Sequence, residues 1–539
     1  MPSPRHKIIE RSRDRDFLLR TSIIIGIVAI ALGFVIAQFG PAKGKLAGMS
    51  SMPPGFGELD LDLEEYVRDL MEGVAEDGQL PEQFSVWEHM FDGKPVPPEV
   101  VASLIRNGVF TDRHLESINT DLRPIFLNYA ETLLGRPDRY NTARDSLIAA
   151  AGETPPPRFA NEFAGHLLQR ENDHASALTY FARELENFPQ TTFARRAELA
   201  SLLKLDDKDA LRDRTEDPLV EASVPRGMFA EALIATNQWG RLSLISARDF
   251  IAGFEPVWVG IALFAAMVWF IILGQLGGLE SGTAARMMIF ITAFLLGCVS
   301  TFLVIPAIYF QDRVVGLTEN GQFLNDAVFY ISGVALREEL FKLLMFVPLL
   351  PVLLKRRSSM EALAAAACVG LGFAFIENFD YTGSGKEGGL FARLITANFL
   401  HAGWTGLAGL ALFHLFRWPK TRWEEFLATF IGVIAAHGFY NLFSSGAAWS
   451  QFAAGLPPVI VLALTAYRYL DMTGEVRDGP RADLSPFGVF VIGSTLVLAF
   501  SWLHACWHMP MADVLEFVGG SALRVGAMVF IFINRLRNE

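Results

Sequence analysis

Long apolar segments alternate with short polar ones over most of the chain. Ten segments approach or exceed the roughly 17–25 apolar residues that a helix needs to span hydrocarbon. They lie near residues 21–40, 257–275, 287–309, 324–354, 360–381, 390–416, 425–445, 456–470, 485–504 and 512–534. The pattern therefore predicts an all-α protein, a polytopic bundle of about ten transmembrane helices in a lipid bilayer.

The first apolar segment follows a basic stretch, residues 1–20, in which six side chains are Arg or Lys. Its apolar part is about 17 residues long, longer than in a secretory signal peptide, and no small-x-small cleavage site follows. We therefore expect residues 21–40 to be an uncleaved transmembrane anchor.

A polar domain, residues 41–250, separates this anchor from the other apolar segments. Residues 41–60 have the composition of a linker, and helical periodicity dominates afterwards. The stretch "ASALTYFARELENFP" is similar to the second helix of a helical-hairpin repeat, but no second copy follows at a fixed period. A tetratricopeptide-like domain and an irregular helical domain both stay open.

Basic side chains are unevenly divided between the two sides of the predicted bundle. One side is rich in them, at residues 355–359, 417–423, 467–484 and 534–539. The other side, at residues 311–322, 380–389, 444–455 and 504–511, carries only Arg313 and Lys386. By the positive-inside rule, both termini are cytoplasmic and the polar domain is extracytoplasmic. We expect an integral protein of a bacterial inner membrane.

Composition and charge exclude some classes of protein. Mean hydropathy is +0.31, and the net charge of −12 comes from residues 41–250, which hold 35 acidic and 22 basic side chains. This balance excludes a basic nucleic-acid-binding surface, so we expect no nucleic-acid partner. The chain has three cysteines, too few for a disulfide framework.

The segment "ALREELFKLL" places charged side chains inside an apolar span. Charges in a bilayer are costly and mark functional sites by default. On a helix, Lys342 lies four residues after Glu338 and three after Glu339, so its ammonium can reach either carboxylate. Two adjacent carboxylates cannot both be ionised cheaply, and an unequal pair is what acid–base chemistry requires.

Three further clusters of polar side chains lie in nearby spans. They are Glu377 with Asn378, His401 alone, and His437 with Asn441 one turn later. Any one of them could be a packing contact between helices or part of a transport path. Together they predict one water-filled cavity that opens to the extracytoplasmic side.

The order of these motifs resembles the PrsW family of intramembrane proteases. "EELFK" matches an EExxK motif, "FAFIEN" matches FxxxEN, and "HGFYN" matches HxxxN. This family is related to CAAX prenyl proteases and bacteriocin-processing enzymes. The resemblance covers roughly residues 255–450, so we expect a protease core at 251–450 and additional transmembrane helices at 451–539.

The resemblance implies hydrolysis of a peptide bond in a membrane-anchored protein, such as an anti-sigma factor. It implies that Glu338 is the general base that activates water, with Glu339 as a supporting carboxylate and Lys342 holding the pair. His401 would position or protonate the leaving group.

The other motif positions would complete the site. Glu377 stands where CAAX proteases have histidine, so it could be a proton shuttle, a second carboxylate or an orienting group, with Asn378 in support. His437 and Asn441 would donate hydrogen bonds to the oxyanion.

A metal is the open question for the chemistry. Two histidines and up to three glutamates could supply a zinc site with an open position. No HExxH motif is present, and Lys342 beside the carboxylates disfavours a divalent cation. We therefore expect a glutamic peptidase without a cofactor and keep zinc as the alternative.

Two other functions compete with the protease. In a proton-coupled transporter, the same carboxylates and histidines would relay protons, although no inverted repeat is visible. In a non-catalytic receptor or assembly factor, the 41–250 domain would bind a protein partner. Loss of cleavage on substitution of Glu338 would separate the protease from both.

Overall fold

The computed structural model shows a protein built from helices throughout the residues that it describes. These residues are 4–39, 123–134, 137–189, 191–254, 256–278, 284–380, 387–444, 456–477 and 484–536. The predicted linker at 41–60 lies outside them, as does the rest of the chain up to residue 122. No strand occurs in the described ranges, which confirms the predicted all-α class.

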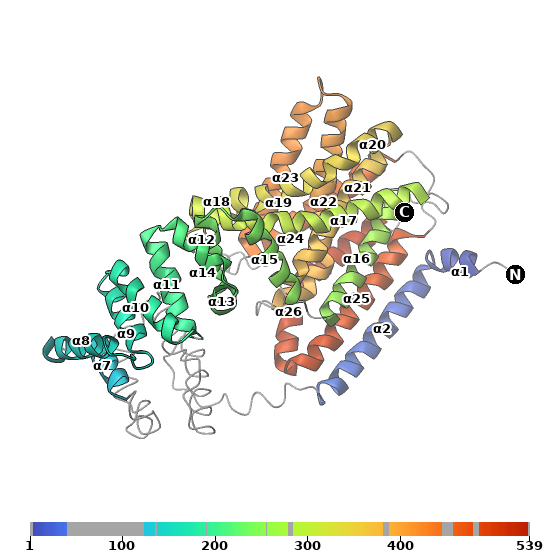
Figure 1. The fold of residues 1–539 in the computed structure, drawn as a ribbon. Coiled ribbons are helices and arrows are strands. Elements are labelled where there is room, and N and C mark those ends of the chain that lie inside the picture. Colours follow the sequence, from blue (N-terminus) through green and yellow to red (C-terminus); the bar gives the residue numbers. More distant parts are fainter. Residues whose placement is uncertain are drawn as a thin grey trace. The chain divides into compact units, whose positions relative to one another are not determined.

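The chain divides into two compact units. One is Ser51–Leu242, and the other combines Met1–Ser50 with Ser243–Glu539. The boundary at residue 242 falls inside a helix, close to the predicted end of the polar domain at residue 250. Figure 1 colours both units along the sequence.

The smaller unit consists of short helices that pack mainly against their neighbours in sequence. They are α7 (Arg123–Leu134), α8 (Pro137–Ala151), α9 (Ala160–Arg170), α10 (His174–Asn187), α11 (Thr192–Leu205), α12 (Lys208–Glu216), α13 (Pro218–Ser223), α14 (Arg226–Ala235) and the start of α15 (Trp239–Ala252). Several begin at an aspartate, because the carboxylates of Asp173, Asp207 and Asp217 accept hydrogen bonds from first-turn amides. These caps explain why the polar turns of the sequence break the domain into short helices.

The core of this unit contains a pair of buried carboxylates. Glu184 of α10 accepts hydrogen bonds from the amides of Phe159 and Glu162, at 2.8 and 3.3 Å, and so satisfies the start of α9. Burial raises the pKa of Glu184 to about 7, despite these bonds and the positive charge of Arg158. Burial, and then the charge of Glu184, raise the pKa of Glu162 well above its usual value.

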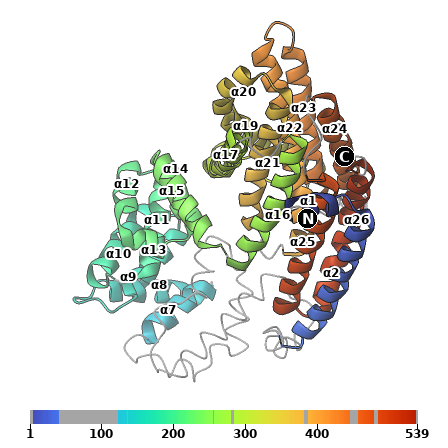
Figure 2. The same cartoon turned by 90° about the vertical axis from the view of Figure 1, so that its right-hand side faces the viewer.

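The larger unit is a bundle of long helices (Figure 2). Its elements are α1 (Pro4–Arg11), α2 (Arg15–Ile36), α16 (Pro256–Leu276), α17 (Ala284–Tyr309), the π-helix η3 (Phe310–Val315), α18 (Phe323–Val328), the π-helix η4 (Phe329–Ala335), α19 (Leu336–Phe346), the 3-10 helix η5 (Val347–Leu349), α20 (Leu350–Arg356), α21 (Ser359–Asp380), α22 (Glu387–Arg417), α23 (Trp423–Ser444), α24 (Leu456–Glu475), α25 (Pro486–His508) and α26 (Met511–Leu536). The predicted anchor forms α2, which packs along α25.

Seven helices in the described residues are long and apolar enough to cross a membrane. They are α2, α16, α17 with η3, α21, α22, α23 and α25. The other three predicted spans are helical too, but 323–356 is broken into five pieces, and charged residues interrupt all three. The polytopic bundle is therefore confirmed with seven candidate spans, and the count of about ten stays a prediction.

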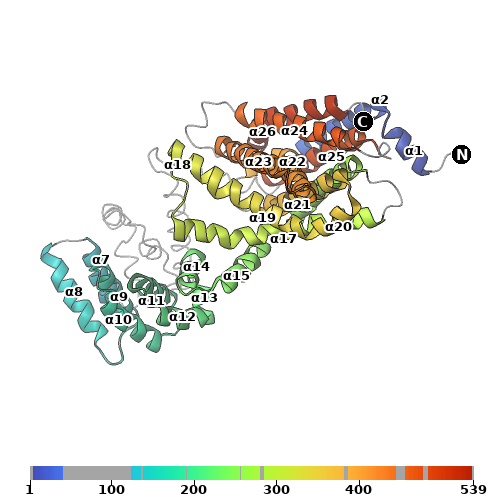
Figure 3. The same ribbon diagram turned by 90° about the horizontal axis from the view of Figure 1, so that it is seen from above.

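The segment with the "EELFK" motif is helical but irregular. The π-helix η4 ends at Ala335, directly before α19, and η5 contains Pro348, where a break in the regular helix is expected. Single π-turns within helices are frequent at functional sites. Seen from above in Figure 3, α19 lies beside α17, α21, α22 and α23.

Close backbone contact at the centre of the bundle depends on glycine. A Cβ on Gly370 of α21 would lie 2.1 Å from the backbone oxygen of His401 on α22. On the opposite side of α21, a Cβ on Gly372 would lie 2.0 Å from the backbone oxygen of Phe294 on α17. Small residues allow this approach between membrane helices. Consequently α21 fixes the depth of His401 in the bundle.

We predict that the α9–α10 region loses stability as the pH rises. The folded state holds the proton of Glu184 more tightly than the unfolded chain does. Protonated Glu184 therefore contributes fully to the free energy of unfolding below about pH 4.5, and this contribution is lost as the pH rises through about 7. Hydrogen exchange of α9 and α10 peptides in the full chain, corrected for intrinsic rates, should show an opening free energy up to about 3 kcal/mol lower at pH 8 than at pH 5.

Glu184→Gln is the matched control for this effect. Its amide oxygen still accepts a hydrogen bond from the Phe159 amide, but it cannot ionise. The variant should show a flatter dependence on pH, and Glu162, whose pKa is also raised, accounts for the part that is left. An equally steep dependence in the variant would assign the effect to other groups.

Candidate active site

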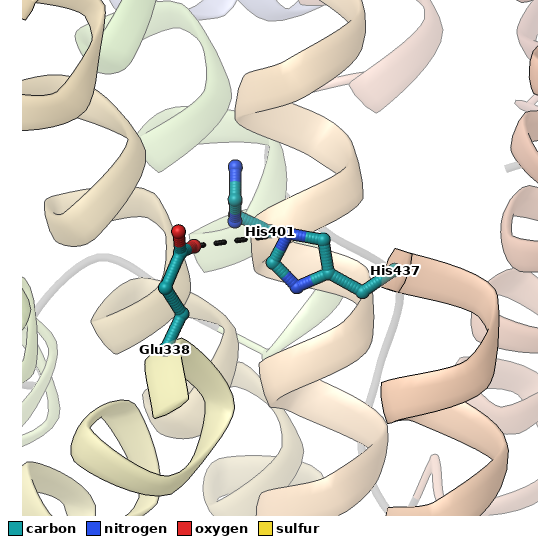
Figure 4. Close-up of side chains that lie close together, drawn as sticks. All are labelled: Glu338, His401 and His437. Carbon is teal, nitrogen blue, oxygen red and sulfur yellow. Dashed lines mark ion pairs between the residues drawn. The ribbon is translucent and has the colours of Figure 1, made fainter. Parts of the chain in front are cut away.

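Side chains from four helices meet in the interior of the larger unit. Helix α19 contributes the two glutamates and the lysine of its motif, α21 contributes Glu377, α22 contributes His401, and α23 contributes His437. Figure 4 shows His401 and His437 facing the carboxylate of Glu338. The structure thus brings together groups that lie up to 99 positions apart in the sequence.

The two adjacent glutamates have different surroundings. Glu339 is fully buried, and its carboxylate accepts hydrogen bonds from Lys342 Nζ at 2.8 Å and Thr405 Oγ1 at 3.1 Å. Nδ1 of His437 lies 2.9 Å from the same carboxylate. Both oxygens of Glu339 are therefore engaged, and its carboxylate contacts three other side chains.

Glu338 is buried but much less engaged. Its Oε2 makes no hydrogen bond to the protein in the described residues. The nearest ionisable groups to this atom are Lys342 Nζ at 3.5 Å and His437 Nε2 at 3.7 Å. A carboxylate with a free lone pair between these two groups can accept a proton from a bound water.

Lys342 is the cation of the centre and is completely buried. Its Nζ lies 2.8 Å from a Glu339 oxygen, 2.8 Å from His401 Nδ1 and 3.9 Å from the centre of the Phe373 ring. An aromatic face stabilises an ammonium through its quadrupole. These contacts explain why the second motif begins with phenylalanine as well as containing a glutamate.

A carboxylate oxygen lies beside one nitrogen of each histidine. His401 Nε2 lies 2.9 Å from Glu377 Oε2, and His437 Nδ1 lies 2.9 Å from Glu339 Oε1. We infer that these nitrogens carry the protons, because a carboxylate can only accept. The remaining nitrogens, Nδ1 of His401 and Nε2 of His437, then present lone pairs toward Lys342 and Glu338 respectively.

Several residues of the site were not predicted from the sequence. Trp404 stacks on His437 with ring centres 4.5 Å apart, and its indole N–H donates to Thr465 Oγ1 of α24. Thr405 follows His401 by one helical turn, and Arg393 precedes it by eight residues on the same helix. In the sequence, the helical spacing of Thr405 and Arg393 from His401 was the feature that could have placed them at the site.

The two predicted amide residues lie apart from this network. Asn378 donates from Nδ2 to Oδ1 of Asn398 at 2.9 Å, which links α21 to α22. Asn441 is half-buried one turn after His437 and makes no side-chain hydrogen bond to the described residues. The predicted roles of Asn378 and Asn441 in the reaction stay predictions.

The centre also has a donor set that fits zinc. Glu338, His401 and His437 each offer one ligand atom, and these atoms lie within 4.8 Å of one another. Catalytic zinc sites use three such ligands, and each histidine is typically oriented by a carboxylate on its other nitrogen, as here. In this structure the ammonium of Lys342 lies among the same donors.

The fold and the site define a polytopic membrane protein with a buried carboxylate–histidine centre. Residues 285–467 match the family model described as PrsW family intramembrane metalloprotease, which confirms the predicted resemblance. The matched segment runs from α17 into α24 and includes every side chain of the centre. No curated protein and no solved structure matches the chain.

We predict that the two glutamates differ in their effect on stability. Glu339→Gln should destabilise the bundle by about 3–5 kcal/mol, because it leaves the buried ammonium of Lys342 without its counter-charge. Glu338→Gln should cost much less, since Oε2 of Glu338 makes no hydrogen bond to the part of the chain that the structure describes. Thermal unfolding of the purified variants in detergent measures both, and the reverse order would contradict this assignment.

Proposed function

We propose that the chain is an intramembrane endopeptidase that cleaves a membrane-anchored protein, of the anti-sigma-factor type, with water activated by Glu338. The observation that carries this proposal is the asymmetry of the two carboxylates. Both oxygens of Glu339 contact neighbouring side chains, whereas Oε2 of Glu338 has no hydrogen-bond partner in the described residues. One group organises the site, and its neighbour is free to react.

The reaction then runs as follows. Glu338 takes a proton from water while the water oxygen forms a bond to the scissile carbonyl carbon. The carbonyl oxygen becomes an oxyanion beside the positive charge of Lys342. The C–N bond breaks as a proton reaches the leaving nitrogen, and the products are a carboxylic acid and an amine.

The histidines have separate parts in this scheme. Nε2 of His437 faces Glu338 and can take over the proton, after which it donates to the oxyanion or to the leaving nitrogen. Both nitrogens of His401 are engaged, by Glu377 and by Lys342, so His401 positions the ammonium. Asn441 supplies a further donor from the next turn of α23.

The depth of the centre supports a substrate within the bilayer. His401 lies 16 residues before Arg417, the end of α22, which corresponds to about 24 Å along a helix. Arg417 donates to the backbone oxygen of Arg357, so the basic ends of α20 and α22 lie together. We assign this basic end to the cytoplasm and the opening of the site to the extracytoplasmic side, where residues 41–250 would recruit the substrate or a protein partner.

The main prediction is loss of cleavage in Glu338→Gln. Because the amide cannot take a proton from water, cleavage should fall by at least about 10³-fold. The assay reconstitutes the full chain with a panel of labelled single-span proteins and maps new N-termini. Glu424→Gln, at the start of α23, is the control; equal cleavage by Glu338→Gln and the native chain would reject the proposal.

Zinc would be held by Glu338, His401 and His437. A bound zinc ion supplies a Lewis acid for the carbonyl and lowers the pKa of its bound water. Against this, Lys342 Nζ lies 2.8 Å from the nitrogen that His401 would offer. The proposal is therefore a glutamic mechanism, in which the ammonium supplies the positive charge.

We predict that cleavage survives removal of metal. Protein treated with a chelator should retain its activity and contain less than one zinc per chain by elemental analysis. Lys342→Met should bind zinc more tightly than the native chain, because it removes a positive charge from the donor set. Activity that is lost on chelation and restored by zinc would assign the chemistry to a metal instead.

A further inference from the structure

Arg393 is a partly buried cation that belongs to no recognised motif of the chain. It lies on α22, and its side chain is 12% exposed. Its guanidinium Nη2 lies 2.9 Å from Oε1 of Glu377 on α21. A buried charge inside a membrane bundle is costly, which by default indicates function.

The partner of Arg393 is not an isolated carboxylate. While Oε1 of Glu377 faces Arg393, the other oxygen, Oε2, lies 2.9 Å from His401 Nε2. The opposite nitrogen of the ring, Nδ1, lies 2.8 Å from Lys342 Nζ. Arg393 therefore belongs to a continuous chain of contacts that leads to the reaction centre.

We propose that Arg393 is a positioning residue of this centre, which fixes Glu377 so that His401 keeps its proton on Nε2 and its Nδ1 lone pair toward Lys342. The expected effect of Arg393 on cleavage rests on the proposed function. Its expected effect on the proton position in His401 does not. Without the guanidinium, the carboxylate of Glu377 is free to rotate away from the ring. His401 can then move its proton to Nδ1, where it would repel the ammonium.

A second ion pair of the bundle, at the buried carboxylate of Glu361, provides the comparison. Arg286 of α17 donates from Nε to Oε1 of Glu361 on α21 at 2.6 Å, and Arg356 binds the same carboxylate. This pair also joins α21 to its neighbours but contacts no histidine of the centre. A purely structural role for Arg393 would give substitutions at Arg393 and Arg286 similar effects.

The first test reads the state of His401 without any substrate. The full chain is labelled with ¹⁵N-histidine, and the His401 signals are assigned by comparison with His401→Asn. We expect an Nε2–H tautomer in the native chain and in Arg393→Lys, and altered His401 nitrogen shifts in Arg393→Gln. Arg286→Gln should leave the His401 signals unchanged.

An unchanged His401 spectrum in Arg393→Gln, or an Nδ1–H tautomer in the native chain, would overturn the inference. Because this experiment needs no cleavage, its result stands even if the chain is not a protease. Failure of the inference is thereby distinguishable from failure of the proposed function.

The second test is a double-mutant cycle on the cleavage of the most rapidly cleaved single-span protein of the panel. Arg393→Gln should lower kcat about 10- to 100-fold with little change in KM, and Arg393→Lys should recover most of the loss. If Arg393 acts through Glu377, the double variant Glu377→Gln with Arg393→Gln should be no slower than Glu377→Gln alone. Independent, multiplicative losses would show that Arg393 acts on the substrate directly and would overturn the proposal.

Discussion

The site depends on one interaction, the buried ion pair between Lys342 and Glu339. Neither side chain is exposed, and their charged atoms are 2.8 Å apart. An unpaired ammonium at this depth would cost several kcal/mol, so the pair must form whenever the bundle closes. Glu339 then also holds His437 and Thr405, so the requirement to neutralise one charge positions groups from three helices.

This requirement leaves Glu338 in an unusual position. It is one residue from Glu339 on the same helix, so it enters the same buried region, but the ammonium is already neutralised. The carboxylate is thus placed beside a cation without being saturated by it. A buried group that keeps a free lone pair next to a positive charge is suited to accept a proton from water.

Much of this arrangement follows from the cost of polar groups in lipid. That argument singled out Glu338, Glu339, Lys342, Glu377, His401 and His437, and the structure places all six in one network. The same argument missed Thr405 and Trp404, because such side chains are common in membrane helices without a polar function. Helical spacing places Arg393 on roughly the same face of α22 as His401, but the sequence does not show that its partner is Glu377 rather than the aqueous surface at the end of the span.

The number of spans depends on how the motif segment is counted. The sequence predicts a span at 324–354, and in the structure the segment 323–356 is helical but divided into five pieces, each too short by itself to cross a membrane. Irregular turns inside a span that carries a polar motif therefore make the span harder to recognise from helix length. The glycine contacts at Gly370 and Gly372 show what compensates: α21 packs backbone to backbone against its neighbours, and this close packing supplies stability that the polar motif helix cannot provide by itself.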